Sequence, residues 1–165
     1  MADEIAVLTT GGTLDKIYFD AKSEFEVGSS IVGRLLEQAE ARVPYRIVEL
    51  LRKDSLDLTD ADRQRIREAA ESDPANRIVI THGTDTMTDT ARSLAGIAGK
   101  TIVLTGALAP ARFAQSDALF NLGMAFGAVQ SLPPGIYIAM NGRIFDATRV
   151  RKDRARNEFV ATDET

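Results

Sequence analysis

The sequence predicts an α/β fold in which a doubly wound, mainly parallel sheet is covered by helices on both faces, as in flavodoxin-like and Rossmann-like three-layer domains. Short apolar runs of strand length alternate along the chain with segments of helical periodicity, which is the pattern of repeated strand–helix–strand units. Several of these runs end in turns rich in glycine and hydroxyl residues, as expected where a buried strand leaves a sheet. Right-handed crossovers then give the doubly wound arrangement.

Five strands are expected in this sheet, and a sixth segment is expected to fold back as a hairpin. The first strand is an apolar run that ends in a glycine turn, and Asn141-Gly142 is a typical tight hairpin turn. The expected strands are residues 5–8, 46–51, 78–80, 101–105 and 135–140, and the hairpin continues over 143–145.

Four helices are expected between and after these strands. Thr59 followed by Asp62 is typical of a capping box, and it precedes a charged segment with helical character. The polar segment 15–30 is expected to be the flexible part of the chain. The expected helices are residues 31–40, about 60–72, about 85–94 and 117–129.

Composition restricts the classes of function. The 165 residues suit one domain spanning 1–165, and the net charge of −4 argues against general nucleic-acid binding. The absence of Cys and the single His exclude disulfides, thiol catalysis and metal sites rich in Cys or His. No apolar run approaches the roughly 20 residues that cross a bilayer, and the acidic start does not read as a signal peptide. We therefore expect a cytoplasmic protein that does not bind membranes.

Ligands bind such sheets at the carboxyl ends of the strands, so the residues that follow each strand are expected to converge. They supply hydroxyls, carboxylates and an ammonium, which are the groups of a hydroxyl nucleophile that works without a histidine base. The residues are Thr10, Gly11, Gly12 and Thr13 after the first strand, Ser55 and Asp57 after the second, Thr84 and Asp85 after the third, and Lys152 beyond the hairpin.

Each of these features also has a structural interpretation. Gly11-Gly12 can present backbone N–H groups to an oxyanion or simply form a tight turn, and its spacing fits no phosphate-binding loop. Thr84 and Asp85 can cap a helix. We interpret His82 as a buried, hydrogen-bonded residue. The basic segment 149–156 lacks interleaved aromatic residues, so a solvated or partner-binding surface is favoured there over a nucleic-acid patch.

Two motifs in the chain resemble the signatures of the bacterial-type L-asparaginase family. They are residues 10–13 (Thr-Gly-Gly-Thr) and residues 81–87 (Thr-His-Gly-Thr-Asp-Thr-Met), and the second motif is long and specific. The spacing of the two motifs is also similar to that of the family. Shorter similarities lie at residues 55–57, 103–107, 120–122 and 141–152, so the resemblance covers nearly the whole chain.

The resemblance implies a catalytic role for residues that match the family pattern. Thr13 would be the nucleophile. Thr84, Asp85 and Lys152 would form a proton relay in which Lys152 draws the proton from Thr84. Tyr18 is assigned as the loop phenol that assists Thr13, although counting without gaps puts a phenylalanine, Phe25, where many members have tyrosine.

The resemblance also implies how the substrate is held. Ser55 would bind the α-carboxylate of L-asparagine, and Asp85 would face its α-ammonium. Gly12 and the Thr84 region would provide backbone N–H groups near the amide oxygen. The products would be aspartate and ammonia, with neither a metal nor an organic cofactor.

The chain departs from common members of the family, which carry a second, C-terminal domain. Because the sequence ends at Thr165, we expect a compact, single-domain form without that domain. Apolar surface left uncovered by its absence predicts a homo-oligomer, a dimer or higher, and the apolar segment 119–129 is the expected contact.

Three other functions remain open at this point. The chain could be a catalytically silent domain that binds asparagine or aspartate. It could be an amidohydrolase for another amide, such as glutamine, a D-amino acid amide or an amidated peptide. A nucleotide-binding flavodoxin-like domain is disfavoured by the lack of a phosphate loop.

Overall fold

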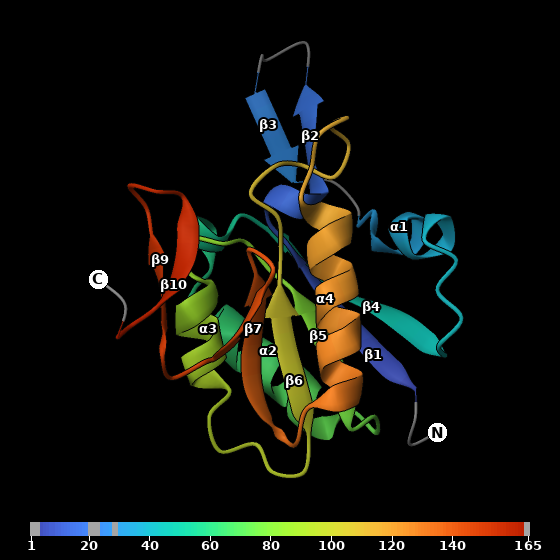
Figure 1. Ribbon diagram of the computed structural model, residues 1–165, viewed down its shortest axis with the longest axis vertical. Helices are drawn as coiled ribbons and strands as arrows, with labels where there is room; N and C mark the ends of the chain where they lie inside the picture. Colours follow the sequence, from blue (N-terminus) through green and yellow to red (C-terminus); the bar gives the residue numbers. More distant parts are fainter. Residues whose placement is uncertain (1–3, 20–23, 28–29, 164–165) are drawn as a thin grey trace.

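The computed structural model describes residues 4–19, 24–27 and 30–163, with residues 17–19 and 24–27 described by their backbone alone. A six-stranded sheet lies between helices on both of its faces (Figure 1). Its strands are β1 (Ile5–Gly11), β4 (Tyr45–Lys53), β5 (Arg77–Thr81), β6 (Thr101–Thr105), β7 (Gly135–Met140) and β8 (Arg143–Asp146). The helices are α1 (Val32–Gln38), α2 (Asp60–Ser72), α3 (Met87–Ser93) and α4 (Ala118–Ser131), and short 3-10 turns form η1 (Thr13–Asp15) and η2 (Ser55–Asp57).

The strand order is β4-β1-β5-β6-β7-β8, and every neighbouring pair is parallel except β7 and β8. The five parallel strands therefore follow the flavodoxin-like order, with β8 as an antiparallel edge. This confirms the predicted mainly parallel, doubly wound sheet.

Alternate residues of the buried strands face opposite layers of helices. On β5, Ile78 and Ile80 pack in the core beneath α2 and α3, whereas Val79 packs in the core beneath α1 and α4. Figure 1 shows α4 in front of the sheet and α2 behind it. Both faces are apolar because helices cover both, and full burial of each such side chain stabilises the fold by roughly 1.5–3 kcal/mol.

The predicted elements agree with the structure, apart from small shifts at their ends. The strands at 101–105 and 135–140 have the expected bounds. The capping box before α2 is confirmed: Asp62 N–H donates to Thr59 Oγ1 over 3.2 Å, and Thr59 N–H donates to Asp62 Oδ2 over 2.9 Å. The helix expected from residue 85 instead begins at Met87, because Thr84 and Asp85 lie in the preceding turn.

Two hairpins were not predicted. One pairs β2 (Lys16–Phe19) with β3 (Glu24–Val27), and the other pairs β9 (Val150–Asp153) with β10 (Glu158–Ala161). Both consist of four-residue strands without a long apolar run, so the sequence gives only a weak strand signal. The expectation that 15–30 is flexible extends over residues 20–23 and 28–29, which lie outside the described residues.

None of the helices among the described residues combines the length and the apolar character that crossing a membrane requires.

Candidate active site

The candidate site lies where β1 and β5 leave the carboxyl edge of the sheet. Thr10 Oγ1 donates a hydrogen bond of 2.7 Å to the carbonyl oxygen of Thr81, which joins the ends of these neighbouring strands. Gly11 and Gly12 then adopt φ angles of 99° and 90°, a conformation that side chains other than glycine rarely take. This turn leads directly into η1 and places Thr13 at its first position.

Glycines let three backbone segments meet at this edge. A Cβ on Gly12 would lie 2.4 Å from the nitrogen of Gly83, and a Cβ on Gly83 would lie 2.6 Å from Cβ of Ser55. The turns that precede Thr13 and Thr84 therefore touch each other, and the second of them also touches η2. The sheet topology thus brings the predicted residues into one region, as the convergence of strand ends requires.

Lys152 contacts both members of the predicted relay. Its Nζ lies 2.9 Å from Thr84 Oγ1 and 2.8 Å from Asp85 Oδ1. The Lys152 side chain is only 11% exposed and the Asp85 side chain 33%, so solvent screens this ion pair incompletely. The predicted grouping of Thr84, Asp85 and Lys152 is therefore present in the structure.

The β9–β10 hairpin explains how a lysine near the end of the chain reaches β5. Lys152 on β9 pairs with Phe159 on β10, and the Phe159 side chain is buried. Phe159 N–H donates to Asn141 Oδ1 over 2.8 Å, which ties the hairpin to the turn after β7. The basic segment 149–156 therefore includes a residue of the candidate site as well as solvated arginines.

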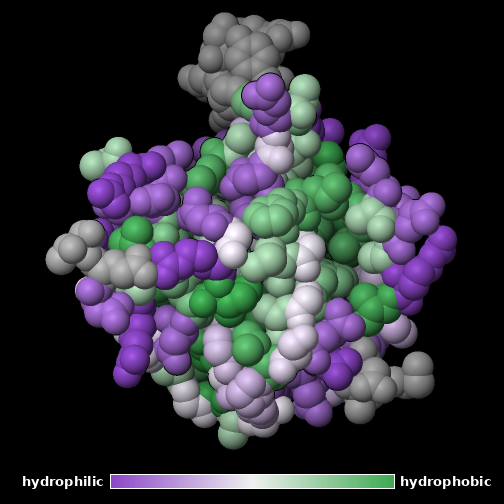
Figure 2. Space-filling view, viewed as in Figure 1, coloured by the Kyte–Doolittle hydropathy of each residue, from purple (hydrophilic) through white to green (hydrophobic). Residues whose placement is uncertain are grey.

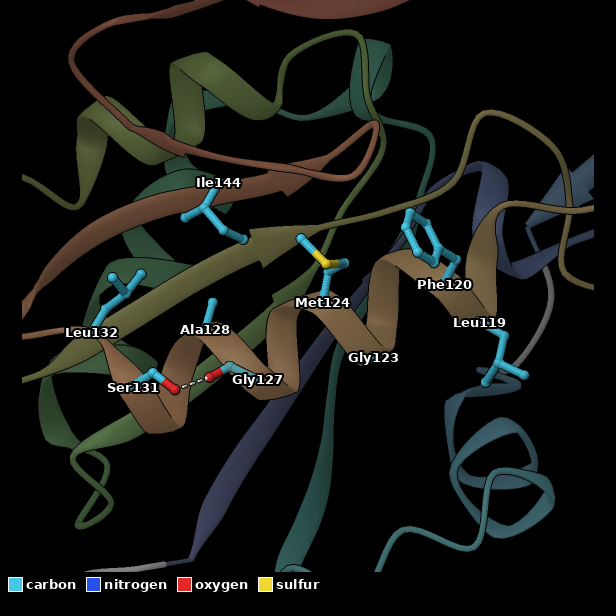
Figure 3. Close-up of a pocket in the computed structure, with 9 residues that line it drawn as sticks. All are labelled: Leu119, Phe120, Gly123, Met124, Gly127, Ala128, Ser131, Leu132 and Ile144. Carbon is cyan, nitrogen blue, oxygen red and sulfur yellow. Dashed lines mark hydrogen bonds between the residues drawn. The ribbon is translucent and has the colours of Figure 1, made fainter.

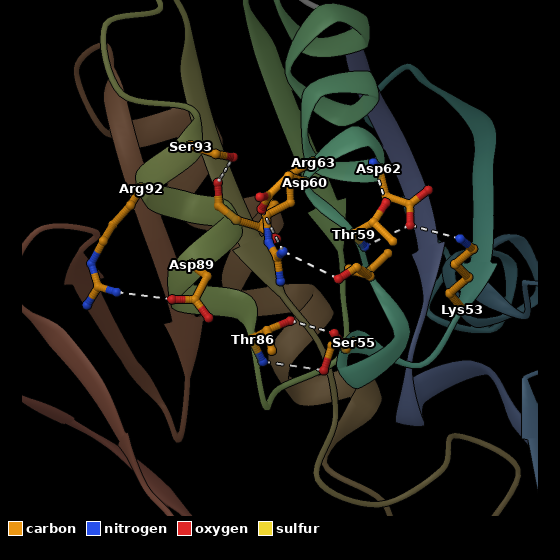
Figure 4. Close-up of polar contacts among 12 residues, drawn as sticks. Lys53, Ser55, Thr59, Asp60, Asp62, Arg63, Thr86, Asp89, Arg92 and Ser93 are labelled. Atoms are coloured by element: carbon orange, nitrogen blue, oxygen red, sulfur yellow. Dashed lines mark hydrogen bonds and ion pairs between the residues drawn. The ribbon is translucent and has the colours of Figure 1, made fainter.

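Ser55 is buried in η2 beside the turn that carries Thr84 and Asp85. Its hydroxyl oxygen accepts the backbone N–H of Thr86 over 3.3 Å, and its carbonyl oxygen accepts the Thr86 hydroxyl over 2.8 Å (Figure 4). Its neighbour Asp57 lies in the same turn but is exposed. Of the two residues expected from this strand end, Ser55 is therefore the one packed against the relay turn.

An ion pair links the start of β2, just after Thr13, to the residue that precedes Ser55. Lys16 Nζ lies 2.8 Å from Asp54 Oδ2, and Asp54 caps η2 by accepting the N–H of Leu56. Partial burial raises the pKa of Asp54, but the Lys16 ammonium and the Leu56 N–H outweigh this and hold it below its usual value. The sequence analysis missed both charged residues. The sequence could have indicated them by their positions, since Lys16 lies three residues after Thr13 and Asp54 directly precedes Ser55.

His82 is a buried, hydrogen-bonded residue, as interpreted from the sequence. Burial lowers its pKa to about 4, so the ring is neutral near pH 7. Nδ1 donates to the Gly83 carbonyl oxygen over 2.6 Å, and Nε2 consequently accepts the Thr90 hydroxyl over 2.7 Å. Through these two hydrogen bonds, His82 connects the turn that carries Thr84 to α3.

The assignment of Tyr18 stays a prediction. Its backbone lies in β2, directly opposite Phe25 of β3, so the two alternative positions considered for the loop phenol are cross-strand partners. Their side chains lie outside the described part of the chain. As for metals, the described residues contain no group of three or more His, Asp or Glu side chains that could hold an ion.

The sequence of this chain is similar to those of known L-asparaginases and glutaminase-asparaginases. The chain is 31% identical over 161 residues to an L-asparaginase of Thermococcus kodakarensis, a match that covers 90% of this chain and 47% of the relative. It is 28% identical over 164 residues to a glutaminase-asparaginase of Pseudomonas fluorescens biotype A, covering 90% of this chain and 45% of the relative. The chain thus spans about half the length of the curated relatives that it matches.

A solved structure agrees with these sequence matches. The crystal structure of a probable cytoplasmic L-asparaginase from Campylobacter jejuni superposes with a TM-score of 0.81 at 26% sequence identity, over 96% of this chain and 51% of that chain. The family model described as "Asparaginase, N-terminal" matches residues 4–161. With Lys152 in contact with Thr84 and Asp85, and with this match over nearly its whole length, the chain belongs to the asparaginase family.

Proposed function

We propose that this protein hydrolyses L-asparagine to aspartate and ammonia, with Thr13 as the nucleophile and residues 1–165 as a single catalytic domain. The observation that carries the proposal is the pair of contacts from Lys152 Nζ to Thr84 Oγ1 and Asp85 Oδ1, beside the Gly12–Gly83 approach. A hydroxyl, a carboxylate and an ammonium in contact form a proton-transfer group without histidine.

In the first step, the Thr13 oxygen attacks the side-chain amide carbon of asparagine. The hydroxyl proton passes to the amide nitrogen, the carbon–nitrogen bond breaks, and ammonia leaves a β-aspartyl ester on Thr13. Backbone N–H groups of the Gly12 turn and of the Thr84 region would stabilise the oxyanion, and such donors are typically among the largest contributions to acyl transfer.

In the second step, a water molecule attacks the ester carbon while Thr84, Asp85 and Lys152 accept its proton. As the ester bond breaks, the same three residues pass this proton to the Thr13 oxygen, so Thr13 regains its hydroxyl and aspartate leaves. Because Lys152 Nζ contacts both Thr84 Oγ1 and Asp85 Oδ1, we describe the proton transfer through Thr84 as one concerted step that involves all three residues. Attack by water directly on the amide is the alternative route through the same residues.

The surrounding groups suit a small zwitterionic substrate. The buried hydroxyl of Ser55 is the proposed partner of the substrate α-carboxylate, and the Asp85 carboxylate is the proposed partner of its α-ammonium. Tyr18 is retained as the proposed phenol that assists Thr13. No metal or organic cofactor has a part in this chemistry.

Two other functions stay in competition. The glutaminase-asparaginase relative makes glutamine the next amide to consider. A silent asparagine-binding domain would keep the binding groups but give no turnover. Ammonia release measured with L-asparagine, L-glutamine and their D-forms separates the three functions. We expect L-asparagine to be preferred over L-glutamine by about 10- to 200-fold in kcat/KM, the discrimination that one methylene typically allows.

We also propose that the working unit is a homodimer that meets along α4. A groove of about 620 Å³ runs beside this helix, and none of its nine lining residues carries a charge (Figure 3). Figure 2 shows hydrophobic residues gathered over α4 on this face. The lining residues are Leu119, Phe120, Gly123, Met124, Gly127, Ala128, Ser131, Leu132 and Ile144.

A second copy is the occupant that this surface fits. Phe120 projects with 61% of its surface exposed, whereas a Cβ on Gly123 or Gly127 would meet nothing within 4 Å. With a two-fold axis across α4, Phe120 of each copy would lie over the open space at Gly123 and Gly127 of the other copy. Such a contact is self-complementary, as two-fold symmetry requires. We place this dimer in the cytoplasm, the compartment assigned to the similar probable cytoplasmic L-asparaginase of Campylobacter jejuni.

A further inference from the structure

Asp15 is a buried acidic residue to which the proposed reaction gives no role. It lies two residues after Thr13, at the end of η1, and only 1% of its surface is exposed. β2 and β3 follow it and project beyond the carboxyl edge of the sheet (Figure 1). Burying a carboxylate is costly unless hydrogen bonds or charges compensate, so its partners indicate why it is there.

The carboxylate joins the two ends of the segment that contains β2 and β3. Asp15 Oδ1 accepts the backbone N–H of Ile31 over 2.9 Å, and the Ser30 hydroxyl hydrogen-bonds to the same carboxylate. Ile31 immediately precedes α1, whose position is set by packing of Val32 and Leu35 in the core. One side chain therefore ties the turn that follows Thr13 to a fixed helix.

Neighbouring residues fix the same turn from other directions. The carbonyl oxygen of Leu14, whose side chain is fully buried, accepts the N–H of Ala111, and Asp15 N–H donates to the carbonyl of Gly12 over 3.1 Å. Lys16 holds Asp54 through the ion pair described above. Each of residues 14, 15 and 16 is thus anchored to a different part of the fold.

The charges that face Asp15 come from two further elements. Burial is the main effect on its pKa and raises it, and Glu49 of β4 adds to the rise. The Ile31 N–H, the Ser30 hydroxyl and Arg112, in the loop before α4, act in the opposite direction. The hydrogen bonds to Asp15 therefore offset only part of the cost of burying its carboxylate.

We propose that Asp15 is a positioning residue for Thr13: by holding the N–H of Ile31, its carboxylate closes the base of the β2–β3 segment and fixes the turn that presents the nucleophile. The proposal rests on the proposed function of Thr13. A displacement of about 1 Å in a reacting group costs on the order of 10²-fold in rate, so a contact two residues away is close enough to matter.

The test compares Asp15→Ala with Asp15→Asn in the full chain. Asp15→Ala removes the acceptor, and we expect kcat for L-asparagine to fall about 10²-fold with a smaller change in KM. Asp15→Asn keeps one acceptor oxygen in the same place, and we expect it to retain kcat within about tenfold. Asp146→Ala is the matched control, because Asp146 also accepts a backbone N–H, that of Thr148 over 2.8 Å, but lies at the exposed end of β8.

Hydrogen exchange at the Ile31 amide gives a readout that does not depend on activity. We expect this amide to exchange at least about tenfold faster in Asp15→Ala than in the unaltered protein, and to stay protected in Asp15→Asn, since a hydrogen bond to a charged group contributes on the order of a tenfold factor or more. If Asp15→Ala does not fold, Asp15→Glu replaces it. That variant keeps the charge but displaces the acceptor by one methylene, so we expect the same loss of kcat.

Unchanged kcat in Asp15→Ala, or equal losses of kcat in Asp15→Ala and Asp15→Asn, would overturn the proposal. Unchanged exchange at Ile31 in Asp15→Ala would do the same. Absence of turnover in the unaltered protein would instead overturn the proposed function, and the exchange measurement would still decide whether Asp15 closes this segment.

Discussion

Gly12 and Gly83 lie so close together that a Cβ built on Gly12 would be 2.4 Å from the Gly83 nitrogen. No side chain fits between these two backbones, so the turn before Thr13 and the turn before Thr84 form one unit. The distance between the two threonines is therefore set by backbone packing rather than by flexible side chains, and substitutions at either glycine should reveal this.

We expect Gly83→Ala to lower stability by about 1–3 kcal/mol, the usual cost of overpacking, because its Cβ would meet Ser55 Cβ at 2.6 Å and Ser55 N at 2.9 Å. Activity should fall more steeply than stability, since both neighbouring segments carry site residues. Chemical denaturation and ammonia release measure the two effects. Gly33→Ala in α1 is the control, because a Cβ there meets only an Ile47 methyl group at 3.3 Å; equal effects of the two substitutions would contradict the account.

Lys152→Met and Asp85→Ala should each lower turnover of L-asparagine at least about 10²-fold, the lower range for loss of an acid–base group. Since Lys152 Nζ contacts Asp85 Oδ1 directly, the double variant should be little worse than either single one. Steady-state kinetics on the three variants, with circular dichroism as the folding control, provides the measurement. Fully multiplicative losses would count against a single coupled relay.

The pH dependence of stability should report on His82. Its pKa falls from 6.5 to about 4 in the folded protein, so below pH 6.5 the unfolded chain binds a proton that the folded one does not. The His82 contribution to stability is therefore complete above pH 6.5 and is lost progressively as the pH falls toward 4. The denaturation midpoints of the unaltered protein and of His82→Gln should therefore converge as the pH falls from 6.5 toward 4. Midpoints that stay equally far apart across this range would refute the assignment of His82 as a buried, neutral residue.

Oligomerisation can be tested on the α4 surface. Light scattering at micromolar concentration should give the mass of a dimer, and Phe120→Ser should weaken association by about 30-fold or more, as expected for a central aromatic residue worth about 2 kcal/mol. Leu56→Ser is the matched control, since Leu56 is similarly exposed at 65% but lies in η2. A monomeric unaltered protein would overturn the proposed interface.

The fold could be predicted from the sequence because its main signals are local. Continuous apolar runs such as Ile78–Ile80 indicate strands buried on both faces, and Thr59 with Asp62 marks the start of α2. The convergence of Thr13, Ser55 and Thr84 followed from the rule that parallel strands end at a common edge. These inferences need no knowledge of side-chain contacts.

The rest of the site depends on contacts between distant residues. Lys152 reaches Thr84 across 68 positions because Asn141 and Phe159 hold the β9–β10 hairpin, a pairing that no periodic pattern indicates. The roles of Lys16 and Asp54 likewise arise only when the start of β2 meets the residue that precedes η2. A four-residue polar strand has too few apolar positions to be recognised before its partner is known.

The most direct test of the account is ammonia release from L-asparagine by Thr13→Ala and Thr13→Ser. The account predicts turnover by the unaltered protein, loss of it in Thr13→Ala despite normal circular dichroism, and partial activity in Thr13→Ser, which keeps a hydroxyl on the η1 turn. Turnover by folded Thr13→Ala at a rate near that of the unaltered protein would contradict the assignment of Thr13 as the nucleophile.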